Sequence, residues 1–417
     1  MAEYILASQN GRTIPTEDAI FGVNTRASQC IREYGKENVI DATIGKLLDD
    51  QGNLLVLASV DEVYRSLKPE EYANYAPIAG TPGFRKAAIQ AALKNNTLKR
   101  IPRACAAPGG TGALRLAVGN YSSIGDTILT TDWHWGPYGK IAGEIGRSVE
   151  TFRLFDNDRN FDVEEFRSHV NGLAEKQDTL LIILNSPGQN PTGYRLTDEE
   201  WKSVIAVLSA LPSSKKIALV ADTAYIDFAG DEDDVRTFLP LFDTLPDNVM
   251  ALLAYSFSKT FTLYGMRCGA LIGLAPDERT AEEFSRVTEY SGRASWSNCA
   301  RAGQAIIEHI YEDPALLERV TAERTEIRNM LLARGAAFGE EASKCGLDML
   351  PYNGGFFAVV PCENAKEVGL KLEKEAHAFT IPFGDGLRVS LAAMPMTQCR
   401  ILPQKMKDVL SSMEYVH

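Results

Sequence analysis

The sequence has little of what marks a disulfide-rich, metal-binding, secreted or membrane protein. Its seven cysteines are an odd number, lie far apart and form no C-x-x-C pair, and there are only five histidines. This spacing predicts neither a disulfide framework nor a zinc site. No apolar run approaches the roughly 18 residues of a membrane span, and the first residues lack the basic and apolar regions of a signal peptide. We therefore expect a cytoplasmic protein without a metal or a membrane partner.

An excess of basic charge is also lacking. The 417 residues include 55 acidic and 43 basic side chains, which gives a formal net charge of -12. Nucleic acid is thus not expected as a partner, because phosphate binding requires a basic face. A small anionic substrate would need a locally basic pocket. The length suits two domains, or one large domain with an appendage.

Short apolar runs of strand length alternate with helical patterns from about residue 100 onward. The clearest runs lie at residues 127–130, 180–184, 217–220 and 251–254. They are continuous rather than alternating, which is typical of strands buried on both faces. This order predicts an α/β fold, with a large domain built on a mainly parallel sheet between helices. Ligands bind such sheets at the carboxyl ends of the strands.

The pattern changes near residue 314. Residues 314–335 are typical of a long helix, and shorter strand and helix patterns follow up to a last helix near Met406. We expect this part to form a smaller α+β domain on which the N-terminal segment packs. The expected division is an N-terminal segment at 1–55, a large domain at 56–315 and a small domain at 316–417, which begins with the long interdomain helix.

One polar stretch follows an apolar strand and contains a lysine. Ser256, Ser258 and Lys259 lie close together, and Arg267 comes eight residues after the lysine. A desolvated lysine amine of lowered pKa can condense with an aldehyde. The hydroxyl groups and the guanidinium can bind a phosphate. The alternative is a lysine at a strand end with an arginine in a surface ion pair.

Three further polar stretches occur at strand ends. A glycine-rich turn with Gly110 and Thr111 precedes a helical run, and a helix N-terminus can bind an anion. Asp222 and Tyr225 follow a buried strand, where a carboxylate could keep a pyridine nitrogen protonated. Asn190 lies in a turn-rich loop. Each stretch alone could be an ordinary turn, but one ligand with a phosphate, an aldehyde and a pyridine ring explains all four.

These stretches resemble the fold-type I pyridoxal phosphate (PLP) enzymes, in particular the class I aminotransferases of the aspartate and aromatic subgroup. The resemblance runs from about Asp41 to Met394 and is most specific at the Asn-Pro-Thr-Gly motif of 190–193 and the Ser-Phe-Ser-Lys motif of 256–259. It implies a seven-stranded, mainly parallel sheet in the large domain, a smaller α+β domain, and pyridoxal 5'-phosphate as the cofactor.

The resemblance also implies a role for each of these residues. Lys259 matches the lysine that binds the cofactor as a Schiff base and then shuttles a proton. Asp222 matches the partner of the pyridine nitrogen, and Tyr225 and Asn190 match the residues on the ring oxygen. The residues that match the phosphate site are Gly110, Thr111, Ser256, Ser258 and Arg267.

Further residues match the family around the ring and between subunits. Trp135 falls where the family stacks an aromatic side chain on the ring, and Trp133 is the alternative. Tyr75 resembles the tyrosine that reaches the phosphate of the neighbouring subunit, which implies a homodimer with shared sites. Gly45 resembles the N-terminal segment that closes over the substrate.

Two arginines match substrate-binding positions. Arg388 matches the arginine that holds the substrate α-carboxylate, a bidentate task suited to guanidinium. Arg293 resembles the arginine that reaches from the other subunit to a distal carboxylate, and a helix-surface arginine is the alternative. The chain departs from the subgroup pattern at Gln189, Trp296 and Cys299. These departures concern substrate preference rather than the cofactor site.

The implied function is ping-pong transfer of an amino group between an L-amino acid, dicarboxylic or aromatic, and a 2-oxo acid such as 2-oxoglutarate. A PLP-dependent C–S or β-lyase on the same fold is the alternative enzyme. A regulator that senses PLP is a second alternative. It is disfavoured because only about 100 residues precede the glycine-rich turn and the protein is acidic.

Overall fold

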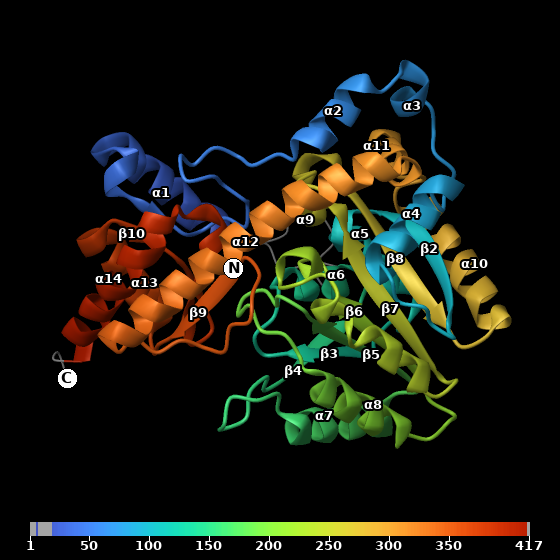
Figure 1. Ribbon diagram of the computed structural model, residues 1–417. Coiled ribbons are helices and arrows are strands. Elements are labelled where there is room, and N and C mark those ends of the chain that lie inside the picture. Colours follow the sequence, from blue (N-terminus) through green and yellow to red (C-terminus); the bar gives the residue numbers. More distant parts are fainter. Residues whose placement is uncertain (1–5, 7–18, 415–417) are drawn as a thin grey trace.

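The computed structural model of the protein describes residue 6 and residues 19–414 (Figure 1). A seven-stranded sheet lies at its centre. In spatial order its strands are β2 (Ile101–Pro108), β8 (Cys268–Ala275), β7 (Val249–Ser256), β6 (Lys216–Asp222), β5 (Thr179–Asn185), β3 (Thr127–Thr131) and β4 (Ser148–Phe152). Within this sheet β8 is antiparallel to both of its neighbours, and the other pairs are parallel. The predicted mainly parallel sheet is confirmed.

Successive residues of the central strands point to opposite faces of the sheet, and both faces are covered. In β5, Leu180 and Ile182 belong to one apolar core and Leu181 and Ile183 to the other. The helices over the first core include α4 (Pro82–Leu93), α7 (Val163–Lys176), α8 (Asp198–Ser209) and α11 (Arg301–Glu312). Those over the second are α5 (Gly109–Asn120), α6 (Pro137–Glu144) and α10 (Glu278–Ser295). Burial on both faces explains why the strands are continuously apolar.

A second, smaller unit surrounds a three-stranded antiparallel sheet. Its strands are β11 (Ile381–Phe383), β12 (Gly386–Ser390) and β9 (Phe357–Pro361), and its helices are α12 (Pro314–Cys345), α13 (Ala365–Ala376) and α14 (Met396–Glu414). The N-terminal elements lie against this unit in Figure 1, where α1 (Ala19–Tyr34) is close to β10 (Ala378–Phe379). β1 (Ile40–Asp41) pairs with β10 in parallel. Because the large sheet and the small unit each have an apolar core, we propose domain boundaries at residues 55 and 315.

The long helix α12 extends ten residues beyond the predicted end at Gly335. A Cβ atom at Gly335 would lie 2.4 Å from the ring of Tyr352, so the glycine allows close packing rather than ending the helix. The helix ends at Gly346, whose φ of +67° is accessible to glycine. α12 contributes Val320 to the core of the large sheet and Phe338 to the core of the small unit. It therefore joins the two units.

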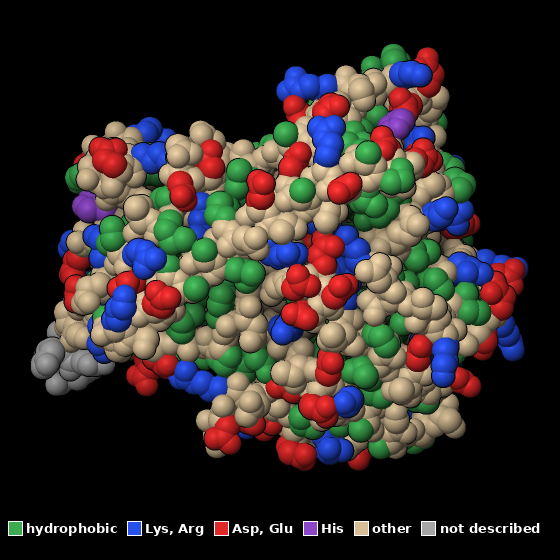
Figure 2. Space-filling model, in the orientation of Figure 1, with side chains coloured by type: hydrophobic (Ala, Val, Ile, Leu, Met, Phe, Trp, Pro, Cys, Tyr) green, Lys and Arg blue, Asp and Glu red, His purple; other side chains and the backbone are tan. Residues whose placement is uncertain are grey.

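The surface carries both signs of charge. On the face shown in Figure 2, acidic and basic side chains lie interspersed among apolar ones. Within residues 19–414 we found no helix with the length and apolar character needed to cross a membrane.

Candidate active site

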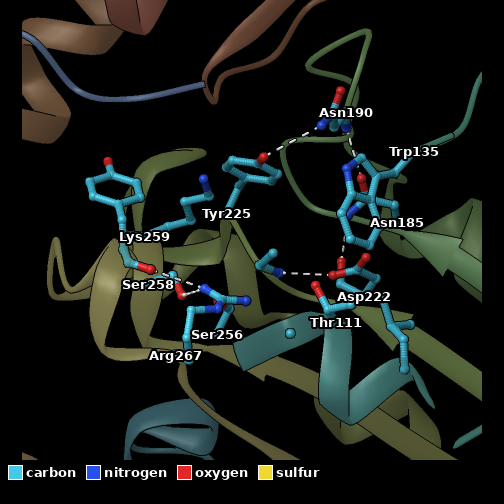
Figure 3. Close-up of a pocket in the computed structure, with 14 residues that line it drawn as sticks. Thr111, Trp135, Asn185, Asn190, Asp222, Tyr225, Ser256, Ser258, Lys259 and Arg267 are labelled. Carbon is cyan, nitrogen blue, oxygen red and sulfur yellow. Dashed lines mark hydrogen bonds between the residues drawn. The ribbon is translucent and has the colours of Figure 1, made fainter. Parts of the chain in front are cut away.

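A pocket of about 280 Å³ lies where the carboxyl ends of β5, β6 and β7 meet the start of α5 (Figure 3). Ten of the residues singled out from the sequence line it: Gly110, Thr111, Trp135, Asn190, Asp222, Tyr225, Ser256, Ser258, Lys259 and Arg267. Four other residues complete the lining, namely Leu114, Asn185, Ala224 and Tyr264. The four polar stretches of the sequence therefore meet at one edge of the sheet.

Lys259 lies on the short helix α9 (Phe257–Thr260), directly after β7. Its Nζ donates a hydrogen bond to the carbonyl oxygen of Gly45 at 3.1 Å and lies 4.7 Å from the ring centroid of Tyr264. Burial, together with the charges of Arg267 and Arg388, lowers the pKa of Lys259 to about 7. A substantial fraction of this amine is therefore neutral near pH 7, as a nucleophile or a general base requires.

Asp222 is buried at the end of β6. Its carboxylate accepts a hydrogen bond from the hydroxyl of Tyr138 at 2.6 Å and another from the backbone N–H of Ala224 at 3.2 Å. Burial raises the pKa of Asp222 to about 6, although both hydrogen bonds act in the opposite direction. Tyr138 belongs to none of the motifs recognised in the sequence. Its signal is its position three residues after Trp135, at the start of α6.

Two asparagines connect the turn-rich loop to Asp222 and Tyr225. The Asn190 Nδ2 lies 3.5 Å from the hydroxyl of Tyr225. Asn185 donates from Nδ2 to the backbone carbonyl of Asp222 at 2.7 Å, and its Oδ1 accepts from the N–H of Asn190 at 2.7 Å. Asn185 therefore fixes Asn190 relative to β6. No role for Asn185 was predicted from the sequence, although it is the polar end of a strongly apolar strand.

The lower left of Figure 3 holds groups suited to an anion. Arg267 donates to the hydroxyl of Ser258 at 3.1 Å, and no carboxylate among the described residues forms an ion pair with it. A Cβ atom at Gly109 would lie 2.5 Å from the Arg267 guanidinium, and one at Gly110 would lie 3.3 Å from the Cβ of Ser256. The backbone at the start of α5 thus comes close to the hydroxyls and the guanidinium. This cradle is suited to a phosphate.

The opposite side of the pocket is lined by an acidic and an aromatic side chain instead of anion-binding groups. Figure 3 shows Asp222 and Trp135 across the pocket from Arg267 and Ser258. A buried carboxylate next to an aromatic side chain suits a protonated, planar nitrogen ring. A phosphate site on one side, an acid on the other and a lysine amine in the same pocket fit PLP.

Arg388 lies on β12, in the small unit, and its side chain is buried. It donates to the carbonyl of Thr43 at 2.7 Å and to the Oδ1 of Asn190 at 3.4 Å, whereas its Nε has no partner. Within the described residues it forms no ion pair. Burial lowers the pKa of Arg388 to about 10. A buried guanidinium with an open donor and no counter-ion is suited to binding a carboxylate.

The segment around Gly45 covers Lys259. A Cβ atom at Gly45 would lie 2.6 Å from the ring of Phe357, so a larger residue here would have to displace this buried ring. The segment is also held to the pocket because the N–H of Leu47 donates to the hydroxyl of Tyr264 at 3.2 Å. Tyr264, which contacts both this segment and the lysine, belongs to none of the motifs recognised in the sequence.

The remaining predicted residues lie outside the pocket. Tyr75 follows α3 (Pro69–Ala73) and is 90% exposed. Arg293 lies near the end of α10, is exposed, and donates to the hydroxyl of Ser297 at 2.6 Å. Trp133, the alternative to Trp135, does not line the pocket and packs against Phe383 with ring centroids 5.8 Å apart.

Comparisons with known proteins identify the family. Residues 37–405 match the family described as aminotransferase class I and II. A crystal structure of an aminotransferase from Anaerococcus prevotii is similar with a TM-score of 0.95 and 36% identity, covering 98% of this chain and 100% of that one. The mitochondrial aspartate aminotransferase of Schizosaccharomyces pombe is 30% identical over 317 residues, which are 73% of this chain and 69% of that protein. An aromatic-amino-acid aminotransferase of Paracoccus denitrificans is 28% identical over 322 residues, 75% of this chain and 78% of that protein. The chain therefore belongs to the class I and II aminotransferases and is a PLP-dependent transaminase.

Proposed function

We propose that this transaminase transfers the amino group between a dicarboxylic or aromatic L-amino acid and a 2-oxo acid such as 2-oxoglutarate, in a ping-pong cycle. We further propose that it acts as a cytoplasmic homodimer with shared sites. The names of the aspartate and aromatic relatives support this substrate class. The observation that carries the proposal is that the Lys259 amine, with its lowered pKa, shares one pocket with an anion cradle and a buried acid.

When bound, PLP supplies an aldehyde that receives amino groups and a ring that withdraws electrons from the substrate Cα. The cradle around Arg267 would hold the phosphate, and Trp135 would cover one face of the ring. Asp222 would keep the proton on the pyridine nitrogen. Tyr225 and Asn190 would donate hydrogen bonds to the ring oxygen.

Substrate handling would fall to residues of both units. Arg388 would hold the α-carboxylate and so orient the substrate Cα. Lys259 Nζ would take the proton from Cα and later return it. The segment around Gly45 would exclude water from the reacting atoms, because its carbonyl already lies 3.1 Å from the amine.

The bond between Tyr138 and Asp222 gives a prediction on pH dependence. Tyr138→Phe removes a hydrogen bond that lowers the pKa of Asp222, so this pKa should rise above about 6. More of the carboxyl group is then protonated near neutral pH, where it cannot hold the proton on the ring nitrogen. We expect the acidic limb of the kcat/KM profile to move to higher pH. Tyr121→Phe, at a tyrosine outside the pocket lining, should leave that limb in place. An unmoved limb in Tyr138→Phe would argue against the role of this bond.

Arg293 and Tyr75 would act in the neighbouring subunit, since neither lines the pocket of its own chain. Arg293→Leu should then lower kcat/KM for dicarboxylic substrates by about 10–100-fold, the loss expected for a charge-assisted hydrogen bond. Aromatic substrates should be little affected. Arg286→Leu, at an exposed arginine of the same helix, is the matched control. An equal loss for both substrate classes would reject the role of Arg293.

The proposed substrate class is tested by mixing the purified PLP form with single amino acids and following the absorbance of the cofactor. Aspartate, glutamate or aromatic amino acids should convert it, and 2-oxoglutarate should restore it. The relatives reported above are named aminotransferases, which does not favour the lyase alternative. Pyruvate and ammonia formed without an acceptor would contradict the proposal.

A further inference from the structure

We propose that Asp227 is a positioning residue. Its carboxylate lies outside the pocket lining and, by this proposal, fixes the turn that carries Asp222 and Tyr225 against the strand end that leads to Lys259. The inference rests on the proposed function, because it concerns the placement of Tyr225 towards the cofactor.

Asp227 is fully buried and makes two short contacts. One carboxylate oxygen accepts a hydrogen bond from the hydroxyl of Tyr255 at 2.7 Å. The other lies 2.7 Å from an Nη atom of Arg236, and both side chains of this ion pair are fully buried. Tyr255 immediately precedes Ser256, the last residue of β7. The carboxylate therefore connects the chain after Tyr225 to β7, the strand that precedes the helix carrying Lys259.

The turn between β6 and Asp227 is held at both ends. At its start, the N–H and the hydroxyl of Thr223 both donate to the carbonyl of Ala254 at 3.2 Å. At its other end, Asp227 lies in the 3-10 helix η2 (Ile226–Phe228) and reaches Tyr255, one residue after Ala254. Tyr225 lies between these two attachments. Loss of the second attachment would leave the turn fixed to β7 at one end alone.

The partner of Asp227 is itself immobilised. Arg236 donates to three backbone carbonyls, those of Ala92 at 3.0 Å, Glu232 at 3.0 Å and Ala91 at 3.3 Å. Two of these carbonyls belong to the end of α4. Through Arg236, Asp227 thus connects the active-site turn to the end of α4.

The charge of Asp227 persists over the working pH range. Burial alone would raise the pKa of Asp227, but Arg236 and Arg324 outweigh it and hold the pKa well below the usual range. A buried ion pair is weak evidence for stability, because desolvation offsets much of the attraction. Its location between the turn and the strand therefore indicates orientation as its role.

The test uses the holoenzyme and the pH titration of the absorbance of the bound cofactor. Tyr255→Phe keeps the ring and the ion pair but removes the bond to Asp227, and Asp227→Asn removes the charge. Both should move the titration midpoint by about half a pH unit, in the direction in which Tyr225→Phe moves it. Both should also lower kcat more than they change KM. If Asp227→Asn does not fold, the titration midpoint of Tyr255→Phe alone tests the proposal.

Glu232→Gln is the matched control. The Glu232 carboxylate pairs with Arg324 at 2.7 Å and with Lys94 at 3.3 Å, and among the described residues it forms no hydrogen bond to Asp227 or Tyr255. This variant should unfold at a lower temperature but keep the wild-type midpoint. The positioning role of Asp227 would be overturned if Tyr255→Phe and Asp227→Asn both kept the wild-type midpoint while Tyr225→Phe moved it. The proposed function would then still stand. An unmoved midpoint in Tyr225→Phe would overturn the proposed role of Tyr225 as well.

Discussion

Lys259→Ala should reduce transamination by about 10⁴-fold or more, the largest effect expected of any single substitution. One amine carries two tasks in this account, as the covalent partner of the cofactor and as the base at the substrate Cα. The neighbours of Lys259 cannot replace it, because the contacts of its Nζ are the carbonyl of Gly45 and aromatic rings. The measurement is kcat/KM, together with single-turnover conversion of the cofactor by an amino acid.

Lys259→Arg distinguishes the chemical role of the lysine amine from the effect of its positive charge. It keeps a cation beside Gly45 and Tyr264, but a guanidinium stays protonated at working pH and cannot act as a base. We expect this variant to be as inactive as Lys259→Ala while it still binds PLP. Activity within about tenfold of wild type in Lys259→Arg would indicate a merely electrostatic role.

The second large effect is expected at Arg388. Arg388→Leu should lower kcat/KM for all amino-acid substrates by about 10²–10³-fold, which corresponds to roughly 3–4 kcal/mol for a buried, hydrogen-bonded charge pair. Arg388→Lys should recover little, because a single ammonium cannot replace a planar guanidinium whose Nε is open while its Nη groups hold Thr43 and Asn190.

Cofactor binding by Arg388→Leu distinguishes the loss of carboxylate binding from a folding defect. Arg388 does not line the cofactor pocket, so Arg388→Leu should still bind one cofactor per chain, as the wild type does. Arg400→Leu, at a half-exposed arginine of α14, is the matched control and should keep wild-type kinetics. A loss of kcat with unchanged saturation by substrate would argue against carboxylate binding by Arg388.

The pocket accounts for anion binding by an acidic protein. The chain has a net charge of -12, yet Lys259, Arg267 and Arg388 lie in or beside one pocket whose single acidic lining residue is Asp222. The two arginines also contribute to the lowered pKa of Lys259. The locally basic pocket expected from the sequence is therefore present, and it also tunes the lysine.

The fold was predictable where the burial of a strand on both faces produces a continuous apolar run in the sequence. The apolar runs at 180–184 and 217–220 became adjacent parallel strands, β5 and β6. The end of α12 was not predictable, because Gly335 is a helix breaker by composition but a packing position against Tyr352 in three dimensions. That contact depends on a residue seventeen positions later in the chain.

The site was predictable where motifs are local. Lys259 and Arg267 lie in one short stretch, whereas Tyr138 meets Asp222 and Tyr255 meets Asp227 across large sequence separations. The identity of such partners depends on strand order and side-chain direction, which periodicity does not give. Residues that hold the active-site groups in place are therefore the ones that sequence patterns miss.

The central claim is a covalent link between the cofactor and one lysine. Reduction of the PLP form with borohydride, followed by peptide mapping, tests it most directly. We expect a single reduced adduct, on the peptide that contains Lys259. An adduct on another lysine, or none at all, would contradict it.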